Sequence, residues 1–322
     1  MKEYTAAEVA ELVREAEGRI RPIIRETLLE PSPFYSELTG ANVYFKCENL
    51  QLTGSFKARG ALNKILSLSN EERARGIVTA SSGNHGAACA FSLKQVGANG
   101  IVFVPEDAST AKVDAIKRLG AEVRHFGNDS GITEGHARQY AADHGMTYVP
   151  PYNDPNVMGG QGTIGLELTR QLPEIDAVIV AVGGGGLISG IAGYLKAAKP
   201  QIDVIGCTPD HSKVMYESIR AGGIVDIPSL PTLSDGTAGG IEPGSITYPV
   251  CRDLIDHFVA VSEEEIAAAM HQFMGVHHMM IEGSAAVPIA TLLKEKERFA
   301  GKNVVIVLCG ANISLSTLKS IL

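Results

Sequence analysis

From Gly76 onward the sequence alternates short apolar runs with helical segments, and this order restricts the fold more than any other feature. The apolar runs predict strands at 77–80, 100–105, 122–126, 147–149, 177–182, 203–207 and 304–308. Helical periodicity predicts helices at 86–96, 110–119, 132–144, 163–171 and 187–199, with a Pro-, Asn- and Gly-rich junction at 150–162. The N-terminal part adds a helix at 5–24 capped by Thr5, a strand at 43–47 and a helix at 56–68. Repeated strand–helix–strand order predicts parallel sheets covered by helices.

The length of the chain indicates more than one domain. Its 322 residues exceed one ordinary hydrophobic core. Runs without polar alternation predict strands that are buried on both faces, as in parallel α/β sheets. We therefore predict an α/β protein with two parallel-type sheets and flanking helices. A small domain of residues 75–154 is expected to be inserted into a large domain of residues 1–74 and 155–322.

The composition excludes several classes of function. The net charge is −8 and no basic run stands out, so nucleic acid is not expected as a partner, because phosphate contacts need clustered Lys and Arg. No signal peptide and no membrane-spanning run is recognisable. The cysteines form no C-x-x-C pair, which argues against a zinc site or a disulfide framework. They are Cys47, Cys89, Cys207, Cys251 and Cys309. We expect a protein of the reduced cytoplasmic compartment.

A glycine-rich turn between a predicted strand and the helix that begins at Leu187 is the strongest functional signal. Four successive glycines leave backbone N–H groups uncovered at a helix N-terminus, which suits an anion and most often a phosphate. They are Gly183, Gly184, Gly185 and Gly186. A flexible loop is the alternative. The P-loop pattern is absent and the spacing does not match the dinucleotide fingerprint, so a nucleotide-binding protein is a weaker alternative.

A second turn, from Ser81 to Gly86, also follows a strand and precedes a helix. Its hydroxyls, its backbone amides and the side-chain amide of Asn84 can hold a carboxylate at the positive end of a helix. Ordinary helix capping and packing on glycine explain the same residues equally well.

Lys57 lies near the start of a predicted helix, where the helix dipole disfavours a positive charge. The same positive end, together with burial, would lower the pKa of this lysine. A lysine tuned in this way is a nucleophile suited to Schiff-base chemistry. A solvated surface lysine is the commoner role of any single lysine and stays the alternative.

In their order along the chain, these motifs resemble those of the fold-type II pyridoxal-phosphate (PLP) enzymes, and within them the serine/threonine dehydratase and serine racemase family. The resemblance covers almost the whole chain and implies a tryptophan synthase β-like fold, with PLP as the cofactor. The segments that carry it are GSFKARG (54–60), SSGNHG (81–86), GGQGTIGLE (159–167), VGGGGLISG (182–190) and VLCGAN (307–312).

The resemblance implies roles for matching residues, and it implies a homodimer. Lys57 is the lysine expected to bind PLP covalently, and Ser82 stands where serine racemases place an acid/base hydroxyl on the opposite face of the substrate. The other residues expected around the cofactor are Phe56 beside the ring, Asn84 at the phenolic oxygen, Cys309 at the pyridine nitrogen, the nearby Glu282, and the phosphate-binding turn from Gly183 to Gly186 with Leu187. The residues expected to contact the substrate are Ser81, Ser82, Asn84, His85, Tyr152 and Gly236.

Together these parts predict a PLP-dependent lyase that converts a small β-hydroxy amino acid to a 2-oxo acid and ammonia by α,β-elimination. The cofactor is the electron sink, and the lysine amine is the general base for the α-proton. The expected class is a carbon–oxygen or carbon–nitrogen lyase of the dehydratase and ammonia-lyase type. An amino-acid racemase that uses Lys57 and Ser82 on opposite faces is the first alternative, and a non-catalytic phosphate- or nucleotide-binding protein is a distant one.

Two stretches depart from the family pattern. Thr208 stands where related enzymes carry a metal-binding glutamate, so we predict no metal site there. The 233–244 segment, which contains Gly236 and Glu242, replaces a shorter substrate wall and predicts a roomier or more polar pocket than threonine requires. This segment resembles that of the dehydratases of hydroxyectoine breakdown, and phenylserine-type dehydratases are a further alternative. Tyr152 is compatible with a bulkier substrate.

Overall fold

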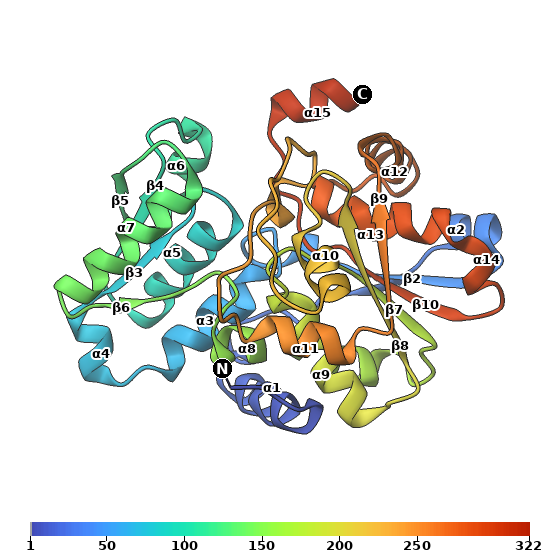
Figure 1. The fold of residues 1–322 in the computed structure, drawn as a ribbon, viewed down its shortest axis with the longest axis horizontal. Coiled ribbons are helices and arrows are strands. Elements are labelled where there is room, and N and C mark those ends of the chain that lie inside the picture. The colour runs from blue at the N-terminus through green and yellow to red at the C-terminus, as the bar shows by residue number, and fades with distance from the viewer. Residues whose placement is uncertain (1) are drawn as a thin grey trace.

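The computed structural model describes residues 2–322, which form two β-sheets with helices around them (Figure 1). The strands of the larger sheet are β1 (Leu29–Pro31), β2 (Asn42–Lys46), β7 (Ala177–Ala181), β8 (Asp203–Pro209), β9 (His257–Val261) and β10 (Asn303–Val307). The strands of the smaller sheet are β3 (Ile77–Ala80), β4 (Gly100–Val104), β5 (Glu122–His125) and β6 (Thr147–Tyr148). The larger sheet has the strand order β1-β2-β10-β7-β8-β9, and the smaller has the order β5-β4-β3-β6.

Helices cover both sheets, and one of them links the two. The helices of the smaller sheet are α4 (Asn70–Arg75), α5 (Asn84–Val96), α6 (Thr110–Arg118) and α7 (Ser130–Asp143). The remaining helices are α1 (Ala6–Ile20), α2 (Pro33–Thr39), α3 (Lys57–Ser67), α8 (Pro155–Gln171), α9 (Gly186–Ala198), α10 (Val214–Ala221), α11 (Thr247–Leu254), α12 (Glu263–His277), α13 (Gly283–Lys294), α14 (Lys296–Phe299) and α15 (Leu315–Ile321), with short 3-10 turns η1 (Glu48–Leu50) and η2 (Asp235–Thr237). Helix α3 packs against both α5 and α8 and therefore lies between the two groups of elements (Figure 1). Within residues 2–322, no helix has both the length and the apolar character that crossing a bilayer would require.

The parallel arrangement is confirmed, with one exception. All pairs in the smaller sheet are parallel, as are the pairs from β2 through β9 in the larger one. Strand β1, which was not predicted, runs antiparallel to β2, so the larger sheet is mixed. β1 is a three-residue edge strand that ends in Pro31. Proline has no N–H to donate to a sheet and is tolerated at such an edge, and so short a strand gave no apolar pattern in the sequence.

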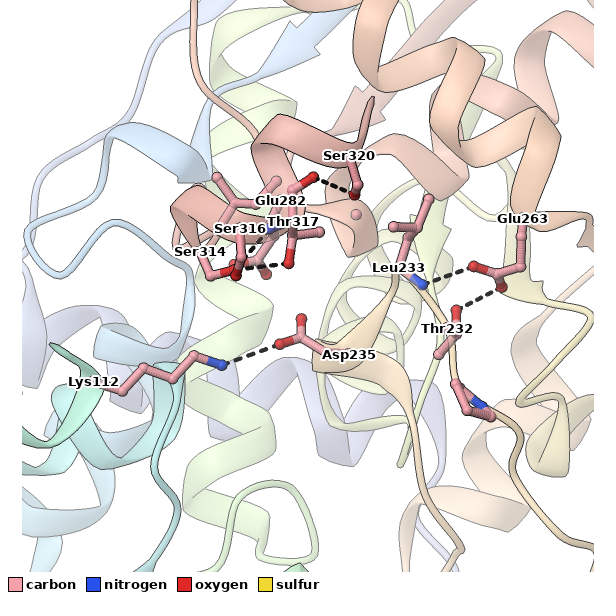
Figure 2. A pocket seen from close by; sticks show the side chains of 13 residues that line it. Lys112, Thr232, Leu233, Asp235, Glu263, Glu282, Ser314, Ser316, Thr317 and Ser320 are labelled. Atoms are coloured by element: carbon pink, nitrogen blue, oxygen red, sulfur yellow. Dashed lines mark hydrogen bonds and ion pairs between the residues drawn. The ribbon is translucent and has the colours of Figure 1, made fainter. Parts of the chain in front are cut away.

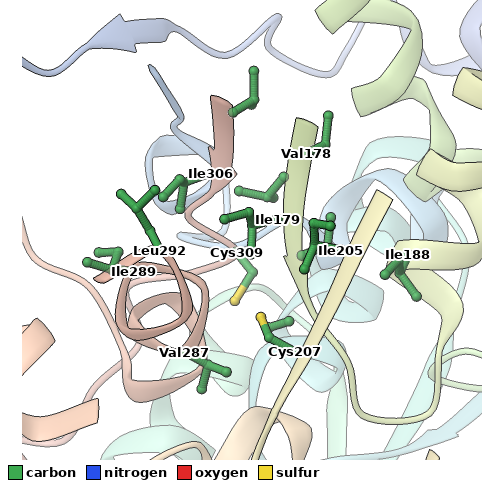
Figure 3. Close-up of a cluster of buried hydrophobic side chains, with 14 of the residues drawn as sticks. Val178, Ile179, Ile188, Ile205, Cys207, Val287, Ile289, Leu292, Ile306 and Cys309 are labelled. Atoms are coloured by element: carbon green, nitrogen blue, oxygen red, sulfur yellow. The ribbon is translucent and has the colours of Figure 1, made fainter. Parts of the chain in front are cut away.

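The main hydrophobic core lies between the central strands of the larger sheet and α13. Figure 3 shows Val178 and Ile179 of β7 and Ile205 of β8 in one cluster with Ile289 and Leu292 of α13. All five side chains are completely buried. A packed sheet of this kind holds the ends of β7 and β10 in fixed positions, and the turns that follow these strands carry predicted site residues.

The segment 155–162 is helical and is not the junction that the sequence predicted. Asp154 caps α8 by accepting two backbone N–H groups of the first turn, and Pro155 occupies the first helical position. The glycines that argued against a helix permit close packing. A Cβ atom on Gly159 would lie 2.8 Å from the carbonyl oxygen of Leu12 in α1. Tertiary packing therefore outweighs the poor helix propensity of glycine here.

The four strands of the smaller sheet fall between residues 77 and 148, within the predicted small domain. The boundaries of that domain at residues 75 and 154 stay a prediction.

Candidate active site

Lys57 is the first residue of α3, and the loop before it is held against the end of β10. The backbone N–H of Phe56 donates to the carbonyl oxygen of Cys309 at 3.0 Å, and Ser55 forms an isolated β-bridge with Gly310. Phe56 is the N-cap, so the helix begins one residue later than predicted. The lysine therefore lies at the carboxyl edge of the larger sheet, which is where open parallel sheets bind ligands.

The side-chain amine of Lys57 lies in an environment that favours its neutral form. Its Nζ donates to the carbonyl oxygen of Pro151 at 2.8 Å and lies 5.2 Å from the centre of the Phe56 ring. Burial lowers the pKa of Lys57 to about 8, and nearby acidic groups, Glu282 among them, only partly oppose this shift. A fraction of the amine is therefore unprotonated near neutral pH, as a nucleophile or general base requires.

A buried ionic network fixes the first turn of α3. Arg59 is completely buried, and its guanidinium lies 2.8 Å from Glu48 and 2.7 Å from Glu167. Lys46 pairs with the other oxygen of Glu167 at 2.5 Å. Burial alone would raise the pKa of Glu167, but the charges of Arg59 and Lys46 outweigh it and hold that pKa well below its usual range. The network lies two residues beyond Lys57 in the chain and positions the helix that carries it.

The sequence analysis assigned no role to this network. The charged residues inside otherwise apolar and glycine-rich motifs could have indicated it. Arg59 stands in GSFKARG and Glu167 in GGQGTIGLE. A buried charge is rare unless it is paired, so two such residues of opposite sign suggest a buried pair.

The glycine-rich turn after β7 forms a cradle that larger residues would fill. A Cβ on Gly184 would lie 2.6 Å from the Tyr152 ring, and one on Gly186 would lie 2.8 Å from the Cβ of that tyrosine. Gly185 has φ +84°, a backbone conformation that favours glycine. Within residues 2–322, the backbone N–H groups of 183–187 donate to no protein acceptor. The cradle thus offers free donors at the N-terminus of α9, the arrangement that binds phosphate.

The turn after β3 begins a helix sooner than predicted. Helix α5 starts at Asn84, and a Cβ on Gly86 would lie 2.0 Å from the carbonyl oxygen of Ser81, so only glycine fits there. The hydroxyl of Ser81 accepts the N–H of Gly83 at 3.1 Å. The half-buried Ser82 hydroxyl forms no hydrogen bond with any of the residues that the structure describes.

Asn84 and Glu282 are joined in one hydrogen-bond network. The Asn84 amide nitrogen donates to both carboxylate oxygens of Glu282, at 2.9 and 3.0 Å, and the backbone N–H of Asn312 donates to the same carboxylate at 3.1 Å. Burial raises the pKa of Glu282 to about 7, although the Asn84 hydrogen bond opposes this. The Cys309 thiol lies 4.0 Å from the same carboxylate, and burial raises the pKa of this thiol. Asn312 was missed, although it ends the VLCGAN segment.

His85 is buried and neutral. Its Nε2 lies 3.1 Å from the carbonyl oxygen of Val149, which places the ring proton on that nitrogen. Burial lowers the pKa of His85 to about 3. Its Nδ1 is buried without a partner in the described chain. Such a ring presents only an acceptor at Nδ1, so the side chain itself would not donate to a carboxylate.

Tyr152 and Gly236 come from opposite sides of the site. The Tyr152 hydroxyl accepts the backbone N–H of Glu242 at 2.9 Å. Gly236 lies in η2, where a Cβ would be 2.7 Å from the Ser284 hydroxyl and 3.4 Å from a carboxylate oxygen of Glu282. Gly236 is therefore close to Glu282, and the 233–244 segment contacts both ends of the site.

A cavity of about 560 Å³ reaches Glu282 from the side of α15 (Figure 2). Lys112 of α6 and Asp235 of η2 pair at 3.2 Å and line it, together with the hydroxyls of residues 314–320. Lys57 is not among the residues that line this cavity, whereas Glu282 is.

At Thr208, where the family pattern has a glutamate and no metal site was predicted for this chain, the hydroxyl donates to the carbonyl oxygen of Ser212 at 2.8 Å. Within residues 2–322, no three His, Cys, Asp or Glu residues lie close enough together to hold a metal ion.

The residues present fit PLP. The cradle offers free N–H groups where a Cβ would clash, and Lys57 has a lowered pKa. The hydroxyls of Ser55, beside Lys57, and of Ser284, beside Glu282, are buried without a partner in the described chain. Buried polar atoms of this kind are normally satisfied, so they indicate a bound polar molecule.

Comparisons with known proteins agree with this geometry. The family described as pyridoxal-phosphate dependent enzyme matches residues 20–310. The chain is 42% identical over 308 residues to an L-threonine ammonia-lyase of Geobacter sulfurreducens, covering 96% of this chain and 76% of that protein. It is 41% identical over 314 residues to a catabolic L-threonine dehydratase of Staphylococcus aureus, covering 96% and 90%.

Solved structures give the same result. The processed form of threonine deaminase isoform 2 from Solanum lycopersicum superposes with a TM-score of 0.94 at 33% identity, covering 99% of this chain and 89% of that one. Serine racemase from Dictyostelium discoideum superposes with a TM-score of 0.88 at 37% identity, covering 95% and 99%.

Proposed function

Because this chain belongs to the family of pyridoxal-phosphate dependent enzymes, we propose that it removes water and ammonia from a small β-hydroxy amino acid and releases a 2-oxo acid. The observation that carries the proposal is the Lys57 amine, whose pKa is lowered to about 8 at the carboxyl edge of the larger sheet. Relatives named for threonine deamination support the choice of reaction. With threonine as substrate, the water lost by elimination is regained in hydrolysis, and the products are 2-oxobutanoate and ammonia.

Different residues of the chain are proposed to carry out different parts of this reaction. When bound, PLP supplies an electron sink for the electrons of the Cα–H bond. Lys57 holds the cofactor and, as the free amine, takes the α-proton. The turn from Gly183 to Leu187 binds the phosphate through backbone N–H groups. The turn from Ser81 to His85 binds the substrate carboxylate at the N-terminus of α5.

Four further residues are proposed to surround the cofactor ring. Phe56 would pack beside it, Asn84 would donate to its phenolic oxygen, and Cys309 would face its nitrogen. Glu282 lies next to Asn84 and Cys309. A thiol with a raised pKa does not stabilise a positive charge on the ring nitrogen as a carboxylate would. A neutral thiol at this position would suit elimination of the β-hydroxyl, which needs less stabilisation from the ring than other reactions of the cofactor.

The proposal is tested by replacing Lys57 with Ala. Borohydride should attach the cofactor to Lys57 in the wild type, as located by peptide mass spectrometry. Lys57→Ala should slow release of 2-oxo acid by about 100-fold or more, the usual contribution of a general base. Lys94→Ala, at an exposed position of α5, is the matched control. Normal turnover in Lys57→Ala would show that another group removes the proton.

A racemase is the second candidate, because the half-buried Ser82 hydroxyl is free to act as an acid. Ser82→Ala should keep most of the dehydration of the L-substrate and abolish any racemisation. Chiral chromatography alongside 2-oxo acid release separates the two outcomes. If wild-type protein turned L-serine mainly into D-serine with little pyruvate, the racemase would replace the lyase.

We further propose that the enzyme is a cytoplasmic homodimer. In support, the five cysteines are free and buried, which suits a reducing compartment. Leu28, Leu50 and Met280 are more than one-third exposed, and a second copy of the chain could cover them. Light scattering of the purified protein should give twice the mass of the 34.0 kDa chain. A mass of one chain at micromolar concentration would exclude the dimer.

A further inference from the structure

An ionic cluster joins α7 to the 233–244 segment and has no role in the proposed reaction. The Arg138 guanidinium lies 2.7 Å from Glu134 of α7 and 2.7 Å from Glu242 of the segment. One positive charge therefore serves two carboxylates, and the cluster keeps a net charge of about −1. Neither the glutamates nor the arginine was predicted as a site residue, although Glu242 was noted as a departure from related sequences.

The cluster is connected to the reactive lysine through residues 151–153. Lys57 donates to the carbonyl oxygen of Pro151. The next residue, Tyr152, accepts the backbone N–H of Glu242, and Asn153 donates from its side-chain amide to the carboxylate of Glu242 at 3.0 Å. The charged cluster thus lies directly behind the backbone that contacts the lysine amine.

Glu134 leaves one carboxylate oxygen available. Its Oε1 accepts from Arg138 and, at 3.1 Å, from the Tyr148 hydroxyl. Its Oε2 receives no hydrogen bond from residues 2–322, and the side chain is 27% exposed. The charge of Glu134 is one of several that partly oppose the lowering of the Lys57 pKa, so its electrostatic field reaches the lysine amine.

Two other parts of the site already have proposed roles. The free N–H groups of 183–187 are proposed for the phosphate, and the turn from Ser81 to Gly86 is proposed for the substrate carboxylate. Strand β6 pairs with β3 in parallel, so residues 149–153 leave the sheet beside that turn. A substrate bound at Lys57 would lie next to residues 151–153, because the Lys57 amine donates to Pro151 and the next two residues are hydrogen-bonded to Glu242.

We propose that Glu134, Arg138 and Glu242 determine substrate specificity by rejecting side chains that end in a carboxylate and accepting neutral or hydrogen-bond-donating ones. The inference rests on the proposed function. An acidic side chain would meet a net negative charge, and the single cation is committed to two carboxylates. Repulsion built against the wrong ligand in this way is an effective source of specificity.

The test compares two substrates that differ in one group. L-Threonine carries a methyl group where 3-hydroxy-L-aspartate carries a carboxylate, and kcat/KM is measured for both with the holoenzyme. Glu242→Gln should raise the hydroxyaspartate-to-threonine ratio of kcat/KM. The double variant with Glu134→Gln leaves Arg138 without a counter-charge and should raise the ratio by about 10- to 100-fold. Arg138→Gln should lower the ratio instead.

Controls separate charge from folding. Glu122→Gln removes a glutamate from an exposed ion pair with Arg124 of β5, outside the Glu134–Arg138–Glu242 cluster, and should leave the ratio unchanged. Because a ratio of two substrates is taken on one enzyme preparation, partial misfolding cancels. Cofactor absorbance and melting temperature confirm that each variant is loaded and folded. Glu134→Gln alone, at a partly exposed position, gives a second measurement if Glu242→Gln does not fold.

The outcomes distinguish this inference from the function on which it rests. A ratio that stays within two-fold of wild type in both the single and the double variant overturns the specificity role, even though threonine is still dehydrated. Equal use of threonine and hydroxyaspartate by the wild type also overturns it. If the wild type releases no 2-oxo acid from any β-hydroxy amino acid, the proposed function fails and the inference fails with it.

Discussion

Glu282→Gln should make the cofactor-free protein more stable relative to wild type at pH 8 than at pH 5. Glu282 is only 3% exposed, and its carboxylate accepts hydrogen bonds from Asn84 and Asn312. Burial outweighs these bonds and raises its pKa from 4.5 to about 7. Between these two values the folded protein keeps a proton that the unfolded chain has released.

The magnitude follows from proton linkage. Where the folded state binds more protons than the unfolded state, the free energy of unfolding falls as the pH rises. The shift from 4.5 to about 7 corresponds to about 3 kcal/mol in total, at about 1.36 kcal/mol per pKa unit. Most of this should be lost between pH 5 and pH 8, because that interval spans the titration of the folded protein. Glutamine does not titrate, so the variant should lack this part of the pH dependence.

The assay is urea unfolding of the cofactor-free protein at one-unit steps from pH 5 to pH 8. At each pH, the unfolding free energy of the wild type is subtracted from that of the variant. The prediction concerns how this difference changes with pH. Glu174→Gln, at an exposed position, corrects for loss of one carboxylate from the surface. A difference that is the same at pH 5 and pH 8 would refute the reasoning, because it would mean that Glu282 ionises at its ordinary pKa in the folded protein.

Three other changes have definite expected outcomes. Gly184→Ala would bring a Cβ within 2.6 Å of the Tyr152 ring. The resulting overpacking, about 1–3 kcal/mol, should weaken PLP binding in an absorbance titration. The control variant Gly275→Ala, whose Cβ has nothing within 4 Å, should bind PLP as the wild type does. Glu167→Gln leaves two buried cations short of a partner and should lower the free energy of unfolding by about 3–5 kcal/mol in urea. Chelator should leave activity and melting temperature nearly unchanged, because the Thr208 hydroxyl already donates to Ser212 and this side chain offers no carboxylate to a metal ion. A large loss restored by magnesium would contradict this.

The sequence allowed prediction of features that depend on neighbouring residues. The glycine turn before α9 and the start of α3 to within one residue each follow from a few consecutive residues, since free N–H groups at a helix N-terminus depend on local chain geometry. Motif order along the chain then indicated the family. The alternation of apolar runs predicted the inner strands, which are buried on both faces.

Features that depend on distant residues could not be predicted in the same way. Arg59 and Glu167 are 108 positions apart, and only the packing of α3 on α8 brings them together. The glycines of α8 argued against a helix because glycine has poor helix propensity, yet Gly159 is required for contact with α1. Strand β1 depends on pairing with β2 along one edge and has too few residues for a pattern.

The 233–244 segment connects the two groups of elements that form the site. Asp235 pairs with Lys112 of α6 at 3.2 Å, and Glu242 pairs with Arg138 of α7 at 2.7 Å. Both cations come from helices that cover the smaller sheet, and that sheet also carries the proposed carboxylate turn. A change in this segment therefore alters the wall facing the substrate side chain and the contacts that hold the smaller sheet in place. Because one segment does both, mutations that widen substrate choice here should also change how firmly the carboxylate turn is held against Lys57. Substrate specificity and turnover should then vary together across variants of the 233–244 segment. They would vary independently if the residues facing the substrate and the residues holding the smaller sheet belonged to different segments.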